Sequence, residues 1–428
     1  MNAENAPLLI TGVGTGRART DITEAILYSI RRHGAGRVVF LCSAKTWEET
    51  LPVILEQLAW PQDRYHVDVC ENEDDVQGLF LRWNRQWNEW ISDCPDRRVI
   101  VDFTSGTKPM SAAAVLLAAA RGADTLSYVV GERDAGGRVE RSTGVFSLCP
   151  DLIVAHRQLR LAAEHFNAGS YAAARDIAAG YQRIEMTPDD HLRSVALSLA
   201  MVAGAYEAWD RFDYKQAAHQ FKQSVRYWDQ WPWIEGPGRL ADNMELVVRA
   251  RDTAKPDQFD APLAADLLAN ADRCLERSKC DDAVCRLYRA CELLAQIRLL
   301  RQHDHKTGAI DPSRLPAGIR ESYDERLRRD GGHKIKLAMA EAYGLLDELG
   351  DDLGKEFRRR YGTWEKRGEL HALLEFRNQS LLAHGTVSVR QEKARNLREH
   401  VLKLAEVTDA EIVEKWYTKA QSVRFGSL

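Results

Sequence analysis

Short apolar segments alternate with helical patterns through the first 150 residues of the chain. The apolar segments cover residues 8–13, 37–42, 66–70, 99–103 and 126–130. This alternation predicts a parallel sheet with helices on both faces, because parallel strands are joined by crossover helices. Gly136 and Gly137 then indicate a terminal hairpin. In such sheets ligands bind beyond the carboxyl ends of the strands, which lead here into loops at residues 12–19, 43–46 and 104–108.

The loop after residues 99–103 has the composition of a phosphate-binding turn. Its small and hydroxyl residues are Thr104, Ser105, Gly106 and Thr107. Lys108 and Pro109 then begin an alanine-rich helical pattern, so that free backbone N–H groups and a mobile cation meet at the positive end of a helix dipole. The alternative is a helix N-cap at Thr107 without a ligand. The Walker A spacing is absent, so ordinary nucleotide hydrolysis is not indicated.

A second glycine-rich loop contains Gly12, Gly14 and Thr15 and directly follows the first strand. Its glycines lack the spacing of a dinucleotide fingerprint, and no acidic residue ends the second strand, which closes with Ser43. An NAD site is therefore disfavoured. The loop fits better as the second wall of a pocket that it shares with residues 104–108.

The segment after the central strand resembles the CARF family, which comprises the ligand-sensing Rossmann-like domains of type III CRISPR defence. The matching residues are Asp102, Thr104, Gly106, Thr107, Lys108 and Met110. The resemblance implies that a cyclic oligoadenylate binds across a two-fold dimer. The residues assigned to this ligand are Gly12, Gly14, Thr15, Ser43, Thr104, Ser105, Gly106, Thr107 and Lys108.

Length and charge limit the remaining possibilities. A chain of 428 residues is too long for one compact core, and we expect two or three domains. The formal net charge of -4 argues against nonspecific capture of duplex nucleic acid but permits a local basic cleft. The longest apolar stretch, residues 112–120, is too short for a membrane helix, and residues 1–7 lack an export signal. We expect a cytoplasmic protein.

The eight cysteines form no Cys-x-x-Cys pair and have no histidine at zinc spacing. Four of them, Cys274, Cys280, Cys285 and Cys291, cluster within a helical apolar pattern. Packing of reduced thiols in a core is the preferred interpretation. We therefore expect neither a metal nor another cofactor.

The remainder of the chain is helical in pattern. We expect a helical connector over residues 151–255, in which residues 166–174 and 212–218 resemble helix-turn-helix corners of the tetratricopeptide type. A linker at residues 255–262 leads to a third, all-α domain over residues 256–428. The fold class is thus an α/β Rossmann-like sensor domain (residues 1–150) followed by two all-α parts.

A candidate catalytic segment lies near the end of the chain. Arg377, Asn378 and His384, within residues 376–385, resemble the Arg-Asn...Ala-His-Gly signature of HEPN ribonucleases. Several other pairs have a similar spacing, and Arg395/His400 even keeps the Asn. The first pair is preferred because neighbouring leucines give its helix an anchoring apolar face and Gly385 follows His384. On a continuous helix Arg377 and His384 would share a face, roughly 10 Å apart.

The resemblance implies catalysis without a metal. The 2'-hydroxyl of RNA already lies beside its own phosphate, so the protein needs only proton transfer and stabilisation of the charged phosphorane. Histidine supplies the first and arginine the second, with Asn378 orienting the pair. One Arg and one His make a sparse site, and a two-fold dimer would double it.

The sequence thus predicts a homodimeric RNA endonuclease that cyclic oligoadenylate activates, with single-stranded RNA as substrate, 2',3'-cyclic phosphate products and no membrane partner. Two alternatives remain open. One is a noncatalytic oligoadenylate sensor whose degenerate HEPN module serves as a dimerisation scaffold. The other is a ring nuclease whose N-terminal pocket cuts the oligoadenylate itself.

Overall fold

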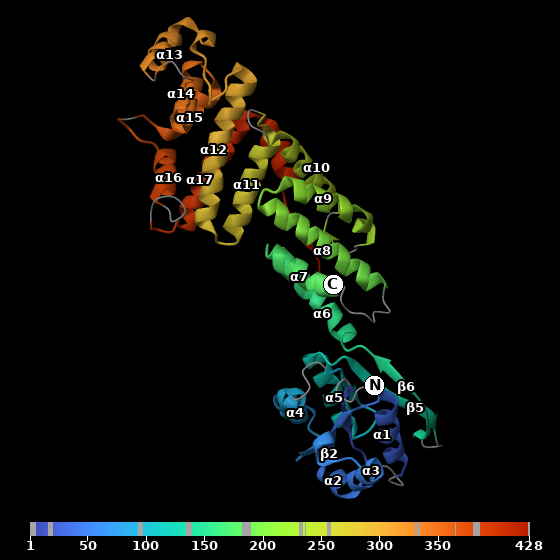
Figure 1. The fold of residues 1–428 in the computed structure, drawn as a ribbon. Coiled ribbons are helices and arrows are strands. Elements are labelled where there is room, and N and C mark those ends of the chain that lie inside the picture. The colour runs from blue at the N-terminus through green and yellow to red at the C-terminus, as the bar shows by residue number, and fades with distance from the viewer. Residues whose placement is uncertain are drawn as a thin grey trace. The chain divides into compact units, whose positions relative to one another are not determined.

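The computed structural model describes residues 6–15, 20–92, 97–133, 139–181, 190–230, 234–235, 237–254, 258–329, 331, 334–363, 365–379 and 386–426. The chain forms two compact units, one of residues 1–158 with 181–193 and one of residues 159–180 with 194–428 (Figure 1). The boundary between them falls inside α6 (Asp151–Asn167), close to the start of the expected connector. The finer division at residue 255 stays a prediction.

The first unit contains a six-stranded sheet. Its strands are β1 (Leu8–Gly12), β2 (Arg37–Ser43), β3 (Tyr65–Cys70), β4 (Val99–Asp102), β5 (Thr125–Arg133) and β6 (Val139–Leu148). The strand order is β3-β2-β1-β4-β5-β6, in which β1 to β5 pair in parallel and β6 pairs antiparallel with β5. The predicted α/β fold, its five strands and the terminal hairpin are confirmed.

Helices cover both faces of this sheet (Figure 1). They are α1 (Thr20–His33), α2 (Ala44–Glu49), α3 (Leu51–Leu58), α4 (Val76–Ser92) and α5 (Lys108–Arg121), with a 3-10 turn at Gln62–Arg64. Successive residues of β1 alternate between two cores, because side chains alternate across a strand. Ile10 packs in the core that contains Trp83 of α4 and Leu117 of α5, whereas Leu9 packs with Ile26 of α1.

The second unit is almost entirely helical. Its helices are α6, α7 (Tyr171–Tyr181), α8 (Asp190–Asp210), α9 (Tyr214–Ser224), α10 (Pro237–Thr253), α11 (Ala261–Glu276), α12 (Cys280–His303), α13 (Ala317–Arg329), α14 (Met339–Glu348), α15 (Asp352–Tyr361), α16 (Glu369–Gln379) and α17 (Gln391–Thr408). Shorter elements are 3-10 turns at Val225–Gln230 and Pro312–Arg314, a π-helix at Ile412–Tyr417, and the strands β7 (Ile234–Glu235) and β8 (Arg424–Phe425). The long helix α12 packs against α11, α14, α16 and α17.

Both predicted corners are helix-turn-helix connections, between α6 and α7 and between α8 and α9. Gly169 turns the first corner with a φ of +72°, and a Cβ there would lie 2.9 Å from the Arg277 side chain. Tyr171 and Tyr214 begin the second helix of each pair and are buried. The sequence pattern therefore identified the corners through residues that the packing requires.

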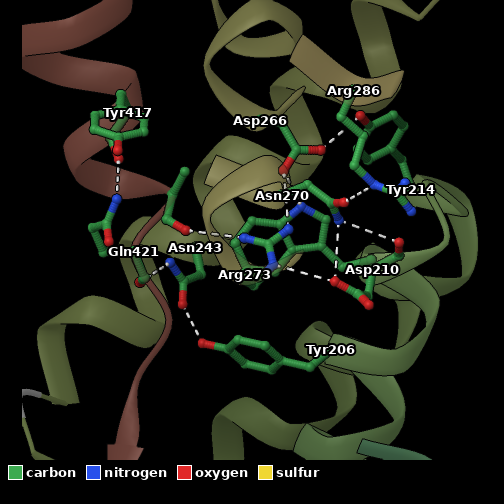
Figure 2. A network of polar contacts seen from close by, with 12 residues as sticks. Tyr206, Asp210, Tyr214, Asn243, Asp266, Asn270, Arg273, Arg286, Tyr417 and Gln421 are labelled. Carbon is green, nitrogen blue, oxygen red and sulfur yellow. Dashed lines mark hydrogen bonds and ion pairs between the residues drawn. The ribbon is translucent and has the colours of Figure 1, made fainter. Parts of the chain in front are cut away.

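A buried polar network joins α8, α9 and α11 (Figure 2). The Asp266 carboxylate accepts hydrogen bonds from Trp209 Nε1 at 2.8 Å and from the Tyr214 hydroxyl at 2.7 Å. Arg273 lies between Asp266 and Asp210 and forms ion pairs with both. Because buried charges are stabilised only when paired and hydrogen-bonded, the network fixes the relative positions of these helices.

The C-terminal residues return to the helices at the start of the second unit. Asn243 of α10 donates to the carbonyl oxygens of Lys419 at 2.6 Å and Gln421 at 3.0 Å. Asn167, at the end of α6, makes two hydrogen bonds to the backbone of Phe425, and β8 pairs with β7. This segment thus connects the last helices of the chain to α6 and α10.

Candidate functional site

The strands β1 and β4 are neighbours in the sheet, and the strand order reverses between them. From β1 the chain continues through β2 and β3 toward one edge of the sheet, and from β4 it continues through β5 and β6 toward the other. The loops after these two strands therefore lie side by side, where such sheets bind ligands. A Cβ on Gly12 would lie 2.5 Å from the carbonyl oxygen of Ser105, and one on Gly14 would lie 3.1 Å from the nitrogen of Gly106. The structure thus brings together the two glycine-containing loops that the sequence singled out.

Asp102, the last residue of β4, holds the 104–107 loop in place. Its buried carboxylate accepts from the backbone N–H of Thr104 at 2.9 Å and from the hydroxyls of Ser29 and Ser127. The Thr104 hydroxyl oxygen in turn accepts from the backbone N–H of Val129 at 2.7 Å. These hydrogen bonds connect the loop to α1 and β5.

Thr107 is the N-cap of α5, as the alternative interpretation of this loop required. Its hydroxyl oxygen accepts from the Met110 N–H at 3.3 Å, and the hydroxyl donates to the Glu73 carbonyl oxygen at 3.0 Å. These bonds already occupy the Thr107 side chain, whereas Lys108 is exposed at the start of α5. The exposed Lys108 and the backbone N–H groups at the start of α5 are therefore better placed to meet an anion than the Thr107 hydroxyl is.

Ser43 also has a capping role. It is the N-cap of α2 and exchanges hydrogen bonds with Thr46, whose N–H donates to Ser43 Oγ at 3.3 Å. Ser105 Oγ is buried and, among the residues described, has no hydrogen-bond partner. Thr15 is partly exposed in the loop after β1. A ligand role for these three residues stays a prediction.

Arg377 lies in the last turns of α16, and its guanidinium Cζ is 4.7 Å from the centre of the Tyr288 ring. Leu370, Leu373 and Leu374 are buried, which confirms this part of the expected apolar face, whereas Leu381, Leu382 and Gly385 lie outside the described residues. The Asn378 side chain and the whole of His384 lie outside the described residues. The separation of Arg377 from His384 therefore stays a prediction.

The competing pair, Arg395 and His400, is divided between two cavities. Arg395 lines a cavity of about 450 Å³ with Asp272 and Tyr417. His400 lines another, of about 590 Å³, where its Nδ1 lies 3.0 Å from Arg360 Nη1. Five residues along a helix correspond to about 140° of rotation, which explains the division. Within one chain these two side chains do not form a joint site.

Among the described residues, no group of three or more histidine, cysteine or acidic side chains could hold a metal ion. The described part of the chain also contains no helix that is both long and apolar enough to cross a membrane. Of the four clustered cysteines, Cys274, Cys280 and Cys291 are buried free thiols, as the core interpretation expected, whereas Cys285 is a free thiol that is only partly buried.

Comparison with known proteins finds similarity in both parts of the chain. Residues 253–408 match the family model described as the Csm6 HEPN domain. The whole chain is similar in structure to Enterococcus italicus Csm6 bound to cyclic hexa-2'-fluoro-hexa-dAMP, with a TM-score of 0.62, 13% sequence identity and coverage of 97% of each chain. The chain shares the fold of Csm6, and its residues 253–408 match a Csm6 HEPN domain. No curated protein sequence matched it.

The HEPN match includes α12 and α16, which carry Tyr288 and Arg377, and the similarity in fold extends to the sheet with its paired loops. Sequence reasoning missed Tyr288 as the partner of Arg377 and Ser29 as a partner of Asp102. Each pair is far apart in the chain, and neither tyrosine nor serine is unusual in a helix. Only the fold brings these side chains together.

Proposed function

We propose that the protein is a homodimeric, metal-independent endoribonuclease of type III CRISPR defence that cyclic oligoadenylate activates. The observation that carries the proposal is the HEPN match over residues 253–408, a range that contains Arg377, Asn378 and His384. The protein would act on single-stranded RNA in the cytoplasm.

The chemistry follows from the two side chains. His384 accepts or donates a proton as the 2'-oxygen attacks the adjacent phosphorus and the bond from phosphorus to the 5'-oxygen breaks. Arg377 stabilises the negative charge of the phosphorane between these steps. The products are a 2',3'-cyclic phosphate and a 5'-hydroxyl. Two protomers supply two arginines and two histidines to one cleft.

The sensor site would use the paired loops. Gly12 and Gly14 leave room for close approach of the ligand, while the N–H groups at the start of α5 and the Lys108 ammonium bind its phosphates. The exposed side of α5 continues from Lys108 through Ala112 and Leu116, the latter 52% exposed. This apolar side supports the two-fold contact of the dimer, since a ligand bound across the two-fold axis needs the two α5 N-termini near each other.

Cleavage of a fluorescent single-stranded RNA in EDTA, with and without cyclic tetra- and hexa-adenylate, tests the proposal. Cleavage that appears only with one of these rings supports it. Binding of a ring without RNA cleavage would favour the noncatalytic sensor. Loss of the ring itself, with intact RNA, would favour the ring nuclease.

A further inference from the structure

Tyr288 of α12 lies beneath the guanidinium of Arg377 from α16, with 4.7 Å between Cζ and the ring centre. Both side chains are partly exposed, so the contact faces solvent on one side. At this distance the ring face attracts a cation. Tyr288 is thus a direct neighbour of the side chain assigned to phosphorane stabilisation.

The kind of contact matters for that task. A carboxylate partner would hold Arg377 by neutralising its charge, whereas an aromatic ring carries no net charge and holds the cation through its quadrupole. Burial raises the pKa of the nearby Cys285 thiol, and the charge of Arg377 opposes this effect. The Tyr288 ring therefore contacts the guanidinium without bringing a negative charge to it, as a group that stabilises an anionic transition state requires.

A row of packed aromatic rings lies near Tyr288. Four rings on α14, α15 and α16 form a row of successive contacts at 3.8, 4.8 and 4.8 Å between centres: Tyr343, Phe357, Tyr361 and His371. The Tyr343 hydroxyl anchors the row to α12 by donating to the Cys291 carbonyl oxygen at 2.7 Å. Burial, followed by the neighbouring Tyr288 phenol, raises the pKa of Tyr361. The row thus links α14, α15 and α16 to α12, the helix that carries Tyr288.

We propose that Tyr288 is a positioning residue for RNA cleavage, whose ring holds the Arg377 guanidinium in the orientation that meets the phosphorane. The inference rests on the proposed function. It assigns the effect to the ring face and not to the phenolic hydroxyl, because the cation lies over the ring.

Two substitutions separate the ring from the hydroxyl. Tyr288→Leu should lower kcat for activated RNA cleavage on the order of tenfold and leave KM within about twofold. Tyr288→Phe keeps the ring and should stay within about twofold of wild type in kcat. In an Arg377→Gln background, Tyr288→Leu should cause no further loss, because the side chain that it positions is gone.

Phe376 offers a matched control. It precedes Arg377 on α16 and makes its own cation–π contact, with Lys393 Nζ 3.1 Å from its ring centre. Phe376→Leu removes an equivalent contact from the same helix without touching Arg377, and kcat should stay near the wild-type value. Melting temperature, dimer content and activator affinity are measured for every variant.

Each outcome decides the inference. It is overturned if Tyr288→Phe loses as much activity as Tyr288→Leu, if Phe376→Leu matches that loss, or if the loss accompanies a lower melting temperature or a dissociated dimer. Unchanged kcat in Tyr288→Leu together with an inactive Arg377→Gln variant refutes this inference alone. Wild-type cleavage by Arg377→Gln would instead refute the catalytic assignment in the proposed function.

Discussion

Gly12 and Ser105 approach so closely that a Cβ on Gly12 would lie 2.5 Å from the Ser105 carbonyl oxygen. The contact joins the loops after β1 and β4 at the point where the strand order reverses. The obstructing atom belongs to the backbone, so a larger residue must displace a loop. The glycine therefore sets the separation of the two walls of the proposed sensor site.

Gly12→Ala should destabilise the protein by about 1–3 kcal/mol, because backbone must shift to admit the methyl group. Urea unfolding measures the stability change, and calorimetry with a cyclic oligoadenylate measures the accompanying loss of affinity. Gly180→Ala in α7 is the control, since nothing lies within 4 Å of its Cβ position. Unchanged stability and affinity in Gly12→Ala would show that the loops tolerate a wider separation.

Lys108→Ala should weaken activator binding by about 1.5–3 kcal/mol, the value of a charge-assisted phosphate contact. Lys108 is exposed at the first position of α5, where an N–H cluster would bind the same phosphate. Calorimetry compares it with Lys222→Ala, which removes an exposed lysine from α9. Unchanged affinity for every ring size tested would remove Lys108 from the site.

Leu116→Glu should shift the protein from dimer toward monomer, because it introduces a charge into the apolar side of α5. Light scattering across a dilution series measures the shift. Leu161→Glu alters another exposed leucine, 44% exposed on α6, and should leave the dimer intact. A dimer that resists Leu116→Glu at every concentration would place the two-fold contact elsewhere.

Glu356 should contribute acid-sensitive stability. Hydrogen bonds from Arg359 and Arg360 hold the pKa of its carboxyl at about 2, below the ordinary value of 4.5. A lowered pKa in the folded state means that the contribution is present above pH 4.5 and is lost as the pH falls toward 2. Because Arg359 is largely exposed, we expect about 1–2 kcal/mol.

Chemical unfolding of wild type and Glu356→Gln across this pH range measures the effect. The stability difference between them should shrink as the pH falls. Glu321→Gln, at an exposed position of α13, should follow wild type throughout. A constant difference between Glu356→Gln and wild type would mean that the carboxyl keeps its ordinary pKa.

The fold of the first unit was largely predictable, because buried parallel strands appear in the sequence as continuous apolar runs. The same strand pattern also predicted that the loops of Gly12 and Ser105 meet, because both loops follow the carboxyl ends of parallel strands, where such sheets bind ligands. The roles of the individual hydroxyl side chains could not be predicted from the sequence. Ser43 and Thr107 both cap helices, and a loop rich in hydroxyl residues has the same composition whether those groups bind a ligand or the backbone.

The helical half was predictable in its periodicity but not in its long-range contacts. Successive turns of α12 carry buried residues such as Leu287, Ala290 and Leu294, as the helical pattern indicated. The contact of Arg377 with Tyr288 depends instead on how α16 packs against α12. Sequence spacing alone also could not separate Arg395 from His400, whereas helix geometry directs them into different cavities.

The central claim is tested most directly by cleavage of single-stranded RNA in EDTA by activator-loaded wild type, His384→Ala and His400→Ala, with analysis of the product ends. The products of wild type should end in 2',3'-cyclic phosphates. His384→Ala should cleave roughly a hundredfold or more slowly while its dimer stays intact. His400→Ala should cleave at nearly the wild-type rate. Loss of cleavage in His400→Ala but not in His384→Ala would contradict the catalytic assignment, and intact RNA of varied sequence after incubation with activated wild type would contradict the nuclease itself.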